Sequence, residues 1–484
     1  MRFLRQLQLD DRPVALARIS LDVRGGETAG ACVVFELSIG QQSFGSIAIP
    51  AVEIGVPLSY AEARSRQGSD EGYRLPDSLV DFTRSALQPE QPLYLAFETP
   101  FGFLPGVPWE GLAAERLMRP ILRLGATPVR PVRSEATLDV AYCCSLPPGL
   151  GKPPAQLVEE LIAQLPPELP QRARVHVFAD AELYPILAGR VESLGHPATI
   201  RLYPPSGAEP FVNPRPSSTE MIEANQIENP WLLWMRDALR DLSLDGVHFI
   251  ASGYLGRSRP GLRFANSPVH DYDNAWSRVV GARQLTLFLE QVGAWAVGFS
   301  SPPGNPSPLG LRMLFDEVSR MLNGPALLHD LRGDSPSDAL RGAYWHIFAP
   351  HAAPFPHSPG LALATHPSWV GGAGSDPTAG RMQALIDEYG LARRVPGLAA
   401  PEDTPSWVTA QQRRLEKSIA AVAAVPEEDR DPSREAGILD ALRFTAELVA
   451  RYAPESASSA VGRVTGGIQG VASEADARRD GMTP

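Results

Sequence analysis

The sequence has few cysteines, no long apolar run and no cluster of basic residues, and each shortage excludes a class of protein. Three cysteines in 484 residues, two of them adjacent at Cys143 and Cys144, cannot build a disulfide framework, and no CxxC pair suggests structural zinc. No apolar run approaches the roughly 18 residues that a membrane-spanning helix needs. A net charge of -11 without an Arg/Lys-dense helix or tail argues against nucleic-acid binding, because phosphate neutralisation requires a basic patch.

Targeting and cofactor motifs are also missing. The N-terminal residues MRFLRQLQLDDRP lack the apolar core and the small-residue cleavage site of a signal peptide, so we expect a cytoplasmic protein. The glycine run at 371–380 has no Gly-Lys-Ser/Thr end and does not lie between a strand and a helix, while the run at 149–154 leads into prolines. Neither run fits a phosphate loop, and we expect no cofactor and no metal.

What the sequence does contain is a regular alternation of strands and helices from residue 138 onward. Apolar strand runs at 138–144, 174–180, 198–203, 246–252, 293–301 and 325–331 are separated by amphipathic helical runs. Strands that are apolar throughout, with helices between them, predict a mostly parallel sheet covered on both faces, which is a three-layer α/β fold. The predicted organisation is a β-rich extension (1–75), the α/β domain (76–345), a Pro/Gly-rich connection (346–380), a helical segment (381–453) and a disordered tail (454–484).

In a parallel sheet, reactive groups lie beyond the carboxyl ends of the strands. The expected strand ends here carry Cys143 and Cys144, then Ser252 before Gly253, then Ser300 and Ser301, and finally His329 and Asp330. These side chains are therefore the candidates for a catalytic or binding site.

Three segments of the chain resemble the CHAT domain, a branch of the caspase-like, separase-related cysteine peptidases of clan CD. They are LAFETPFGFLPGVPWEGL at 95–112, VHFIASGYL at 247–255 and GAWAVGFSSP at 293–302. The resemblance implies a caspase-like fold over residues 76–345 and a role in bacterial conflict or defence systems. It also implies a catalytic His at position 252 and a catalytic Cys at position 300 or 301, where this chain has serines. A peptidase of this type needs a thiolate and an imidazole, so both catalytic positions are degenerate.

Other residues could replace the missing pair. His248 lies four residues before Ser252, about 13 Å back along the strand, so we expect a buried histidine that hydrogen-bonds to a neighbour. His329 with Asp330 could serve Ser300 or Ser301 as base and orienting acid, although adjacent strand residues point to opposite faces. Cys143 or Cys144 could be reactive, but packing as a small hydrophobic side chain is the commoner role.

The leading hypothesis is a pseudopeptidase that binds or scaffolds a protein or peptide partner, with no nucleic acid and no membrane involved. Pairing with an active CHAT-like protein is compatible with this role. The alternative is a peptidase or hydrolase with a rebuilt site that uses Ser300 or Ser301 with His329. A third option keeps the former substrate cleft as a peptide-binding site without cleavage, and an open, polar-walled cleft would favour it.

Overall fold

The computed structural model describes residues 14–366, apart from 24–29, 41, 67, 89–90, 126–136, 147–153, 167–168, 170–171, 192–198, 213–226, 241, 257–258, 270–276, 303, 305–306, 323, 332–336 and 350–357. Apart from residues 240–243, they belong to one unit of the chain. The stretches expected to be a helical segment (381–453) and a disordered tail (454–484) lie outside the described residues.

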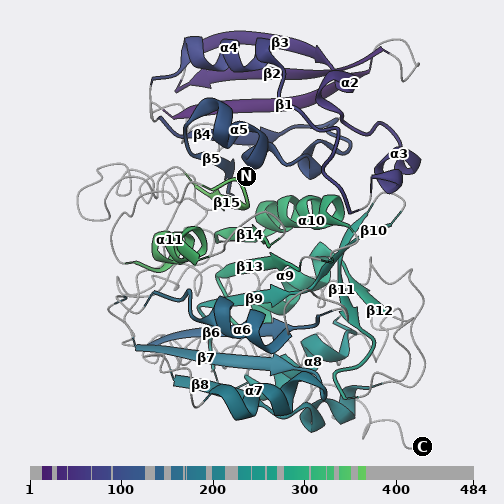
Figure 1. Cartoon of the computed structure of the whole chain (residues 1–484), viewed down its shortest axis with the longest axis vertical. Helices are drawn as coiled ribbons and strands as arrows, with labels where there is room; N and C mark the ends of the chain where they lie inside the picture. The colour runs from purple at the N-terminus through teal and green to yellow at the C-terminus, as the bar shows by residue number, and fades with distance from the viewer. Residues whose placement is uncertain are drawn as a thin grey trace, which may run out of the picture. The chain divides into compact units, whose positions relative to one another are not determined.

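A mixed, mostly parallel sheet of 12 strands organises this unit, in the order β3-β2-β1-β4-β5-β15-β14-β13-β9-β6-β7-β8. Figure 1 shows β3 at one edge of the sheet and β8 at the other. The α/β fold with helices on both faces is as the alternating pattern predicts. The strands are β1 (Ala15–Val23), β2 (Ala31–Ile39), β3 (Gln42–Pro50), β4 (Leu93–Phe97), β5 (Ile121–Leu124), β6 (Thr137–Cys144), β7 (Arg172–Ala179), β8 (Thr199–Tyr203), β9 (Gly246–Ile250), β13 (Ala296–Ser301), β14 (Ala326–Asp330) and β15 (Leu361–Thr365).

Helices cover both faces because the central strands are apolar on both sides. In β9, Phe249 contacts Phe288 of α9 on one face, while the next residue back, His248, bonds to Tyr344 of α11 on the other. The longest helix, α10, is capped by Ser307, whose hydroxyl accepts from the amide of Gly310. The helices are α2 (Ala51–Ile54), α3 (Tyr60–Ser65), α4 (Asp77–Ala86), η2 (Leu104–Gly106), α5 (Trp109–Leu117), α6 (Pro154–Ile162), α7 (Leu183–Val191), η3 (Pro205–Phe211), α8 (Pro230–Ala238), α9 (Ala282–Gln291), α10 (Pro308–Met321) and α11 (Ser337–Phe348).

The sheet extends beyond the stretch expected to form the α/β domain. At the N-terminal side, β1 pairs with β4 in parallel, so the first three strands continue the main sheet. At the other side, β15 lies inside the stretch expected to be a Pro/Gly-rich connection, and it pairs antiparallel with β14. Helix α11 likewise continues to Phe348, into residues whose prolines suggested an irregular path. The boundaries of the sheet depend on which strands pair with each other, and local amino-acid composition does not predict that pairing.

The strand run expected at 246–252 is shorter than predicted, since β9 ends at Ile250 and Ser252 belongs to another strand. Residues Ser252–Leu255 form strand β10 of a separate three-stranded sheet with β11 (Pro260–Ala265) and β12 (Ser277–Val280). Gly253 is in the middle of that strand, where a Cβ would lie 2.3 Å from the carbonyl oxygen of Ser307. Glycine is needed here for the close approach of β10 to α10, not for a turn.

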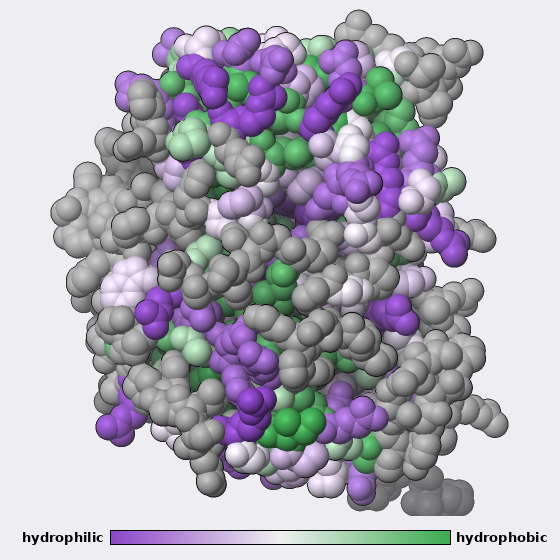
Figure 2. All heavy atoms as spheres, viewed as in Figure 1, coloured by the Kyte–Doolittle hydropathy of each residue, from purple (hydrophilic) through white to green (hydrophobic). Residues whose placement is uncertain are grey.

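Hydrophilic and apolar side chains are interspersed over the described part of the face in Figure 2. The large apolar side chains that are exposed are scattered over different elements: Val52, Met118, Ile186 and Met321. None of the described helices is both long enough and apolar enough to cross a membrane.

Candidate functional site

Ser252, at the position where the resemblance implies a histidine, is buried at the start of β10. Strand β9 of the main sheet ends two residues earlier, at Ile250, whose carbonyl accepts a hydrogen bond from the amide of Ser145. From there the chain crosses to the small sheet, in which Ser252 pairs with Arg263. The Ser252 hydroxyl has no hydrogen-bond partner among the residues that the structure describes. A hydroxyl with no base beside it has no means of activation.

Ser300 is fully buried near the end of β13 and bonds to His248. The distance from Ser300 Oγ to His248 Nε2 is 2.8 Å. His248 is level with Gly298 in the neighbouring strand, two residues before Ser300, and its ring crosses over Gly298 to reach the serine. A Cβ on residue 298 would lie 2.2 Å from His248 Nδ1, so only glycine leaves room for this arrangement. His248 is thus the buried, hydrogen-bonded strand histidine that we expected, and its partner is one of the candidate serines.

Two tyrosines complete a buried hydrogen-bond network on this face, which we call the His248 network: Tyr142, Tyr344, His248 and Ser300. Tyr142 donates to the hydroxyl oxygen of Tyr344 at 3.0 Å, and the Tyr344 hydroxyl lies 2.7 Å from His248 Nδ1. Since Tyr344 accepts from Tyr142, its own proton is directed at Nδ1, and the ring proton of His248 is on Nε2. That nitrogen then donates to Ser300 and offers no lone pair to its hydroxyl.

Electrostatics also disfavour His248 as a base. Burial, and secondarily the charge of His329, lowers the pKa of His248 to about 3. A general base works best when its pKa is near the operating pH, so this imidazole is a poor proton acceptor. Burial raises the pKa of Tyr344 and Tyr142 as well, which keeps both hydroxyls protonated. The His248 network is therefore a neutral set of hydrogen bonds that joins α11 to the sheet.

The other predicted candidates fall on opposite faces of the sheet. His329 pairs with Ser300 and Asp330 pairs with Ser301, as parallel neighbours do. Asp330 and Ser301 line a pocket on the α10 side, whereas Ser300 lies on the α11 side with His248. The register thus brings Ser300 and His329 side by side on the α11 side, and Ser301 and Asp330 side by side on the pocket side. Neither serine has both His329 and Asp330 on its own face, so the proposed serine, histidine and aspartate do not converge on one point.

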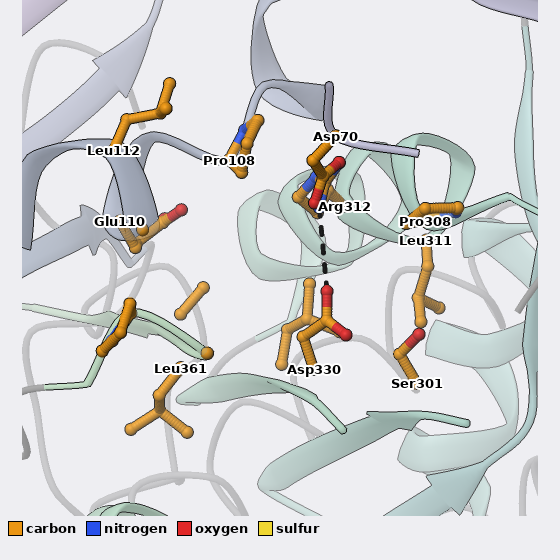
Figure 3. Close-up of a pocket in the computed structure, with 15 residues that line it drawn as sticks. Asp70, Pro108, Glu110, Leu112, Ser301, Pro308, Leu311, Arg312, Asp330 and Leu361 are labelled. Atoms are coloured by element: carbon orange, nitrogen blue, oxygen red, sulfur yellow. Dashed lines mark hydrogen bonds and ion pairs between the residues drawn. The ribbon is translucent and has the colours of Figure 1, made fainter. Parts of the chain in front are cut away.

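The pocket lies at the carboxyl ends of β13 and β14 and has a volume of about 410 Å³. Figure 3 shows Arg312 between Asp70 and Asp330, with Ser301 on one side and Glu110 on the other. No histidine or cysteine is among the described residues that form its wall. The other lining residues come from the start of α5, from α10, from β14, and from β15 with the residues just before it: Pro108, Gly111, Leu112, Pro308, Leu311, Leu328, Pro359, Gly360, Leu361 and Ala362.

Sequence reasoning missed the ion pairs that surround this pocket. Arg312 forms a bidentate pair with Asp70 at 2.5 and 3.2 Å, donates to the carbonyl of Gly106 at 2.6 Å and lies 3.9 Å from Asp330. Glu110, the acid of the PWE motif, accepts from Arg123 Nε at 2.7 Å. A signal was present in the sequence, because an arginine in the apolar run Ile121–Leu124 requires a buried acidic partner.

Burial by itself lowers the pKa of Arg123. The carboxylates of Glu110 and Asp316 have the opposite and larger effect, so the pKa of Arg123 is raised. The guanidinium also lies over the rings of Phe97 and Phe315, at 5.3 and 5.0 Å from their centres. The wall behind Glu110 is therefore a buried ion-pair cluster in which the guanidinium is held by carboxylates and by aromatic rings.

Cys143 and Cys144 are fully buried at the end of β6, which pairs with β9. Burial raises the pKa of both thiols, and the neighbouring Cys144 adds to this effect on Cys143. We expect a thiol reagent such as 5,5′-dithiobis(2-nitrobenzoate) to modify only partly exposed Cys32 in the native protein, and all three cysteines after unfolding. Rapid native modification of a second thiol, traced by mass spectrometry to Cys143 or Cys144, would restore them as candidate nucleophiles.

Fold and site together define an α/β protein with a closed hydroxyl–imidazole network on one face of its sheet and an open, charged pocket on the other. No family model, no curated protein and no solved structure matches this chain.

Proposed function

We propose that this chain is a catalytically inactive, CHAT-like protein that binds a peptide segment of a protein partner in the pocket at the ends of β13 and β14. The observation that carries the proposal is the separation of pocket and imidazole. Ser301 lines the pocket, whereas the imidazole of His248 bonds to Ser300 on the other face of the sheet. A pocket whose described wall has polar groups, but neither the imidazole nor the thiol that a peptidase of this class uses, supports binding without cleavage.

The size and wall of the pocket support a peptide as the ligand. Its volume is within the range of small-molecule and peptide-side-chain sites, and leucines and prolines alternate with a few charged groups around it. A role in a bacterial conflict or defence system, and pairing with an active CHAT-like protein, rest on the resemblance of residues 95–112, 247–255 and 293–302. The alternative function is a hydrolase that uses Ser300 or Ser301 with His329.

The absence of catalysis can be tested directly. We expect the purified protein to leave a mixture of fluorogenic peptides and unfolded casein uncut, because Ser300 is fully buried against an imidazole whose pKa is about 3, and no histidine is among the described residues that line the pocket with Ser301. Mass spectrometry of the digest detects any product. Cleavage by the wild type that is lost in Ser300→Ala or Ser301→Ala would refute the proposal and favour the hydrolase.

Binding needs its own test. An array of acetylated, amidated decapeptides should contain sequences that bind the wild-type protein. Leu112→Trp, which fills the pocket from the half-buried start of α5, should weaken that binding by about tenfold or more. Ile186→Trp, on an exposed position of α7 outside the pocket, is the matched control and should bind as the wild type does. Equal binding by the Leu112→Trp variant would place the peptide elsewhere.

A further inference from the structure

Each charged side chain that lines the pocket at the ends of β13 and β14 has an oppositely charged partner within the chain. Asp70 forms the bidentate pair with Arg312, and Asp330 lies 3.9 Å from the same guanidinium. Glu110 pairs with Arg123, which lies behind the wall. A charged occupant would therefore lose its hydration without meeting a wall group that still needs a counter-charge, and this loss opposes binding.

The guanidinium of Arg312 is engaged on several sides. Its Nε donates to the carbonyl of Gly106 at 2.6 Å, and its terminal nitrogens lie 2.5 and 3.2 Å from the carboxylate oxygens of Asp70. The dashed line in Figure 3 marks its further pairing with Asp330. The first turn of α5 also carries the carboxylate of Glu110, which repels a second anion. The described wall thus offers an acidic side chain no free cation.

Non-polar groups make up most of the rest of the described wall. Leu328 of β14 is directly opposite Ala362 of β15, and both are on the face of the sheet that carries Asp330, because alternate residues of a strand share a face. Leu311 of α10 lines the same cavity together with three prolines: Pro108, Pro308 and Pro359. When a non-polar side chain displaces water from such a wall, the burial of apolar surface favours binding.

We propose that the pocket selects an aliphatic side chain, of which leucine is the type, in the peptide that it binds. This rests on the proposed function, because it names the side chain that the peptide-binding pocket accepts. Leu311, Leu328 and Ala362 supply the non-polar contact, and the ion pairs of the wall hold the elements around it. The cavity of about 410 Å³ has room for more than the methyl group of alanine.

The test uses acetyl-Ala-Ala-X-Ala-Ala-amide peptides with leucine, alanine, lysine or glutamate at X, and isothermal titration calorimetry on the full chain. We expect the leucine peptide to bind about tenfold or more tighter than each of the other three, because only its side chain buries a large apolar surface without a charge. The difference between leucine and alanine should persist in high salt, since no charge pairing contributes to it.

A variant that fills the pocket tests the location. Ala362→Leu puts an aliphatic side chain of the chain's own beside Leu328, so it should lower the affinity for the leucine peptide to about that of the alanine peptide. Ala48→Leu, the same change at an exposed position of β3, is the matched control and should preserve the preference. An unchanged preference in a folded Ala362→Leu variant would place the leucine side chain outside this pocket.

The failures of the two proposals are distinguishable. If the lysine or glutamate peptide binds as tightly as the leucine peptide, the aliphatic preference is wrong while peptide binding stands. If only decapeptides of the array bind, the same four residues are substituted along the tightest of them, and the absence of any position that prefers leucine rejects the preference. If no peptide of either kind binds, both proposals fail. The peptide series keeps the preference testable if the Ala362→Leu variant does not fold.

Discussion

Replacing Glu110 with alanine is expected to lower the free energy of unfolding by about 3–5 kcal/mol. The guanidinium of Arg123 is buried, and Glu110 is its nearest acid at 2.7 Å. Without that carboxylate the remaining charged partner within reach is Asp316 at 3.7 Å, too far for a good hydrogen bond. A buried cation that loses its main partner keeps its desolvation cost, and urea unfolding followed by circular dichroism measures the loss.

Two comparisons separate this effect from a general loss of charge. Asp77→Ala removes an acid from an exposed pair with Arg116 and should change stability by no more than about 1 kcal/mol. Glu110→Leu combined with Arg123→Met removes both charges and should be more stable than Glu110→Ala alone. A loss below about 1 kcal/mol for Glu110→Ala would show that Arg123 finds another acid, and the PWE glutamate would have no special role in the fold.

Gly298→Ala should cost about 2–4 kcal/mol, although it adds a single methyl group. The new Cβ would lie 2.2 Å from Nδ1 of His248 and 2.9 Å from Cε1, so the ring must move. It cannot move easily, because the ring of Tyr142 stacks on it with 5.3 Å between ring centres. Displacement breaks the bonds to Tyr344 and Ser300 and leaves buried polar groups unsatisfied.

A double-mutant cycle tests this cause. His248→Ala removes the obstacle, so Gly298→Ala in that background should cost much less than in the wild type, with a coupling of about 1–3 kcal/mol. Gly189→Ala, in a helix with open space around it, is the matched control and should be neutral or stabilising by up to about 1 kcal/mol. If the effects of Gly298→Ala and His248→Ala on stability are additive, a clash between the new methyl group and the His248 ring is not the cause of the loss.

The same network bears on the proposal that Ser300 is not a nucleophile. His248 is the best-placed imidazole for a candidate serine, yet its pKa is held at about 3 and its Nε2 donates to Ser300. The serine is itself fully buried, so a substrate carbonyl has no access to it. The hydrogen bond between His248 and Ser300 joins the neighbouring strands β9 and β13, and the bond from Tyr344 to the same imidazole joins α11 to the sheet.

By itself, the sequence determined the α/β class, the opposite orientation of His329 and Asp330, and the strand ends that carry the candidate residues other than Ser252. Ser252 was expected at the end of a main-sheet strand but begins β10 of the small sheet. These follow from local rules: apolar runs give buried strands, amphipathic runs give helices, and strand side chains alternate between faces. The absence of a histidine at Ser252 and of a cysteine at Ser300 and Ser301 was also readable, because it concerns residue types alone.

Only the tertiary structure decided which residues meet. His248 and Ser300 are 52 residues apart, and they meet because β9 pairs with β13 in a register that sets the histidine beside Gly298. Tyr344 is a further 44 residues along the chain and reaches the same imidazole from α11. Local periodicity assigns a side chain to one face of the sheet. Strand order and register depend on long-range packing, and they decide that the side chains on one face form the His248 network while those on the other face line the pocket.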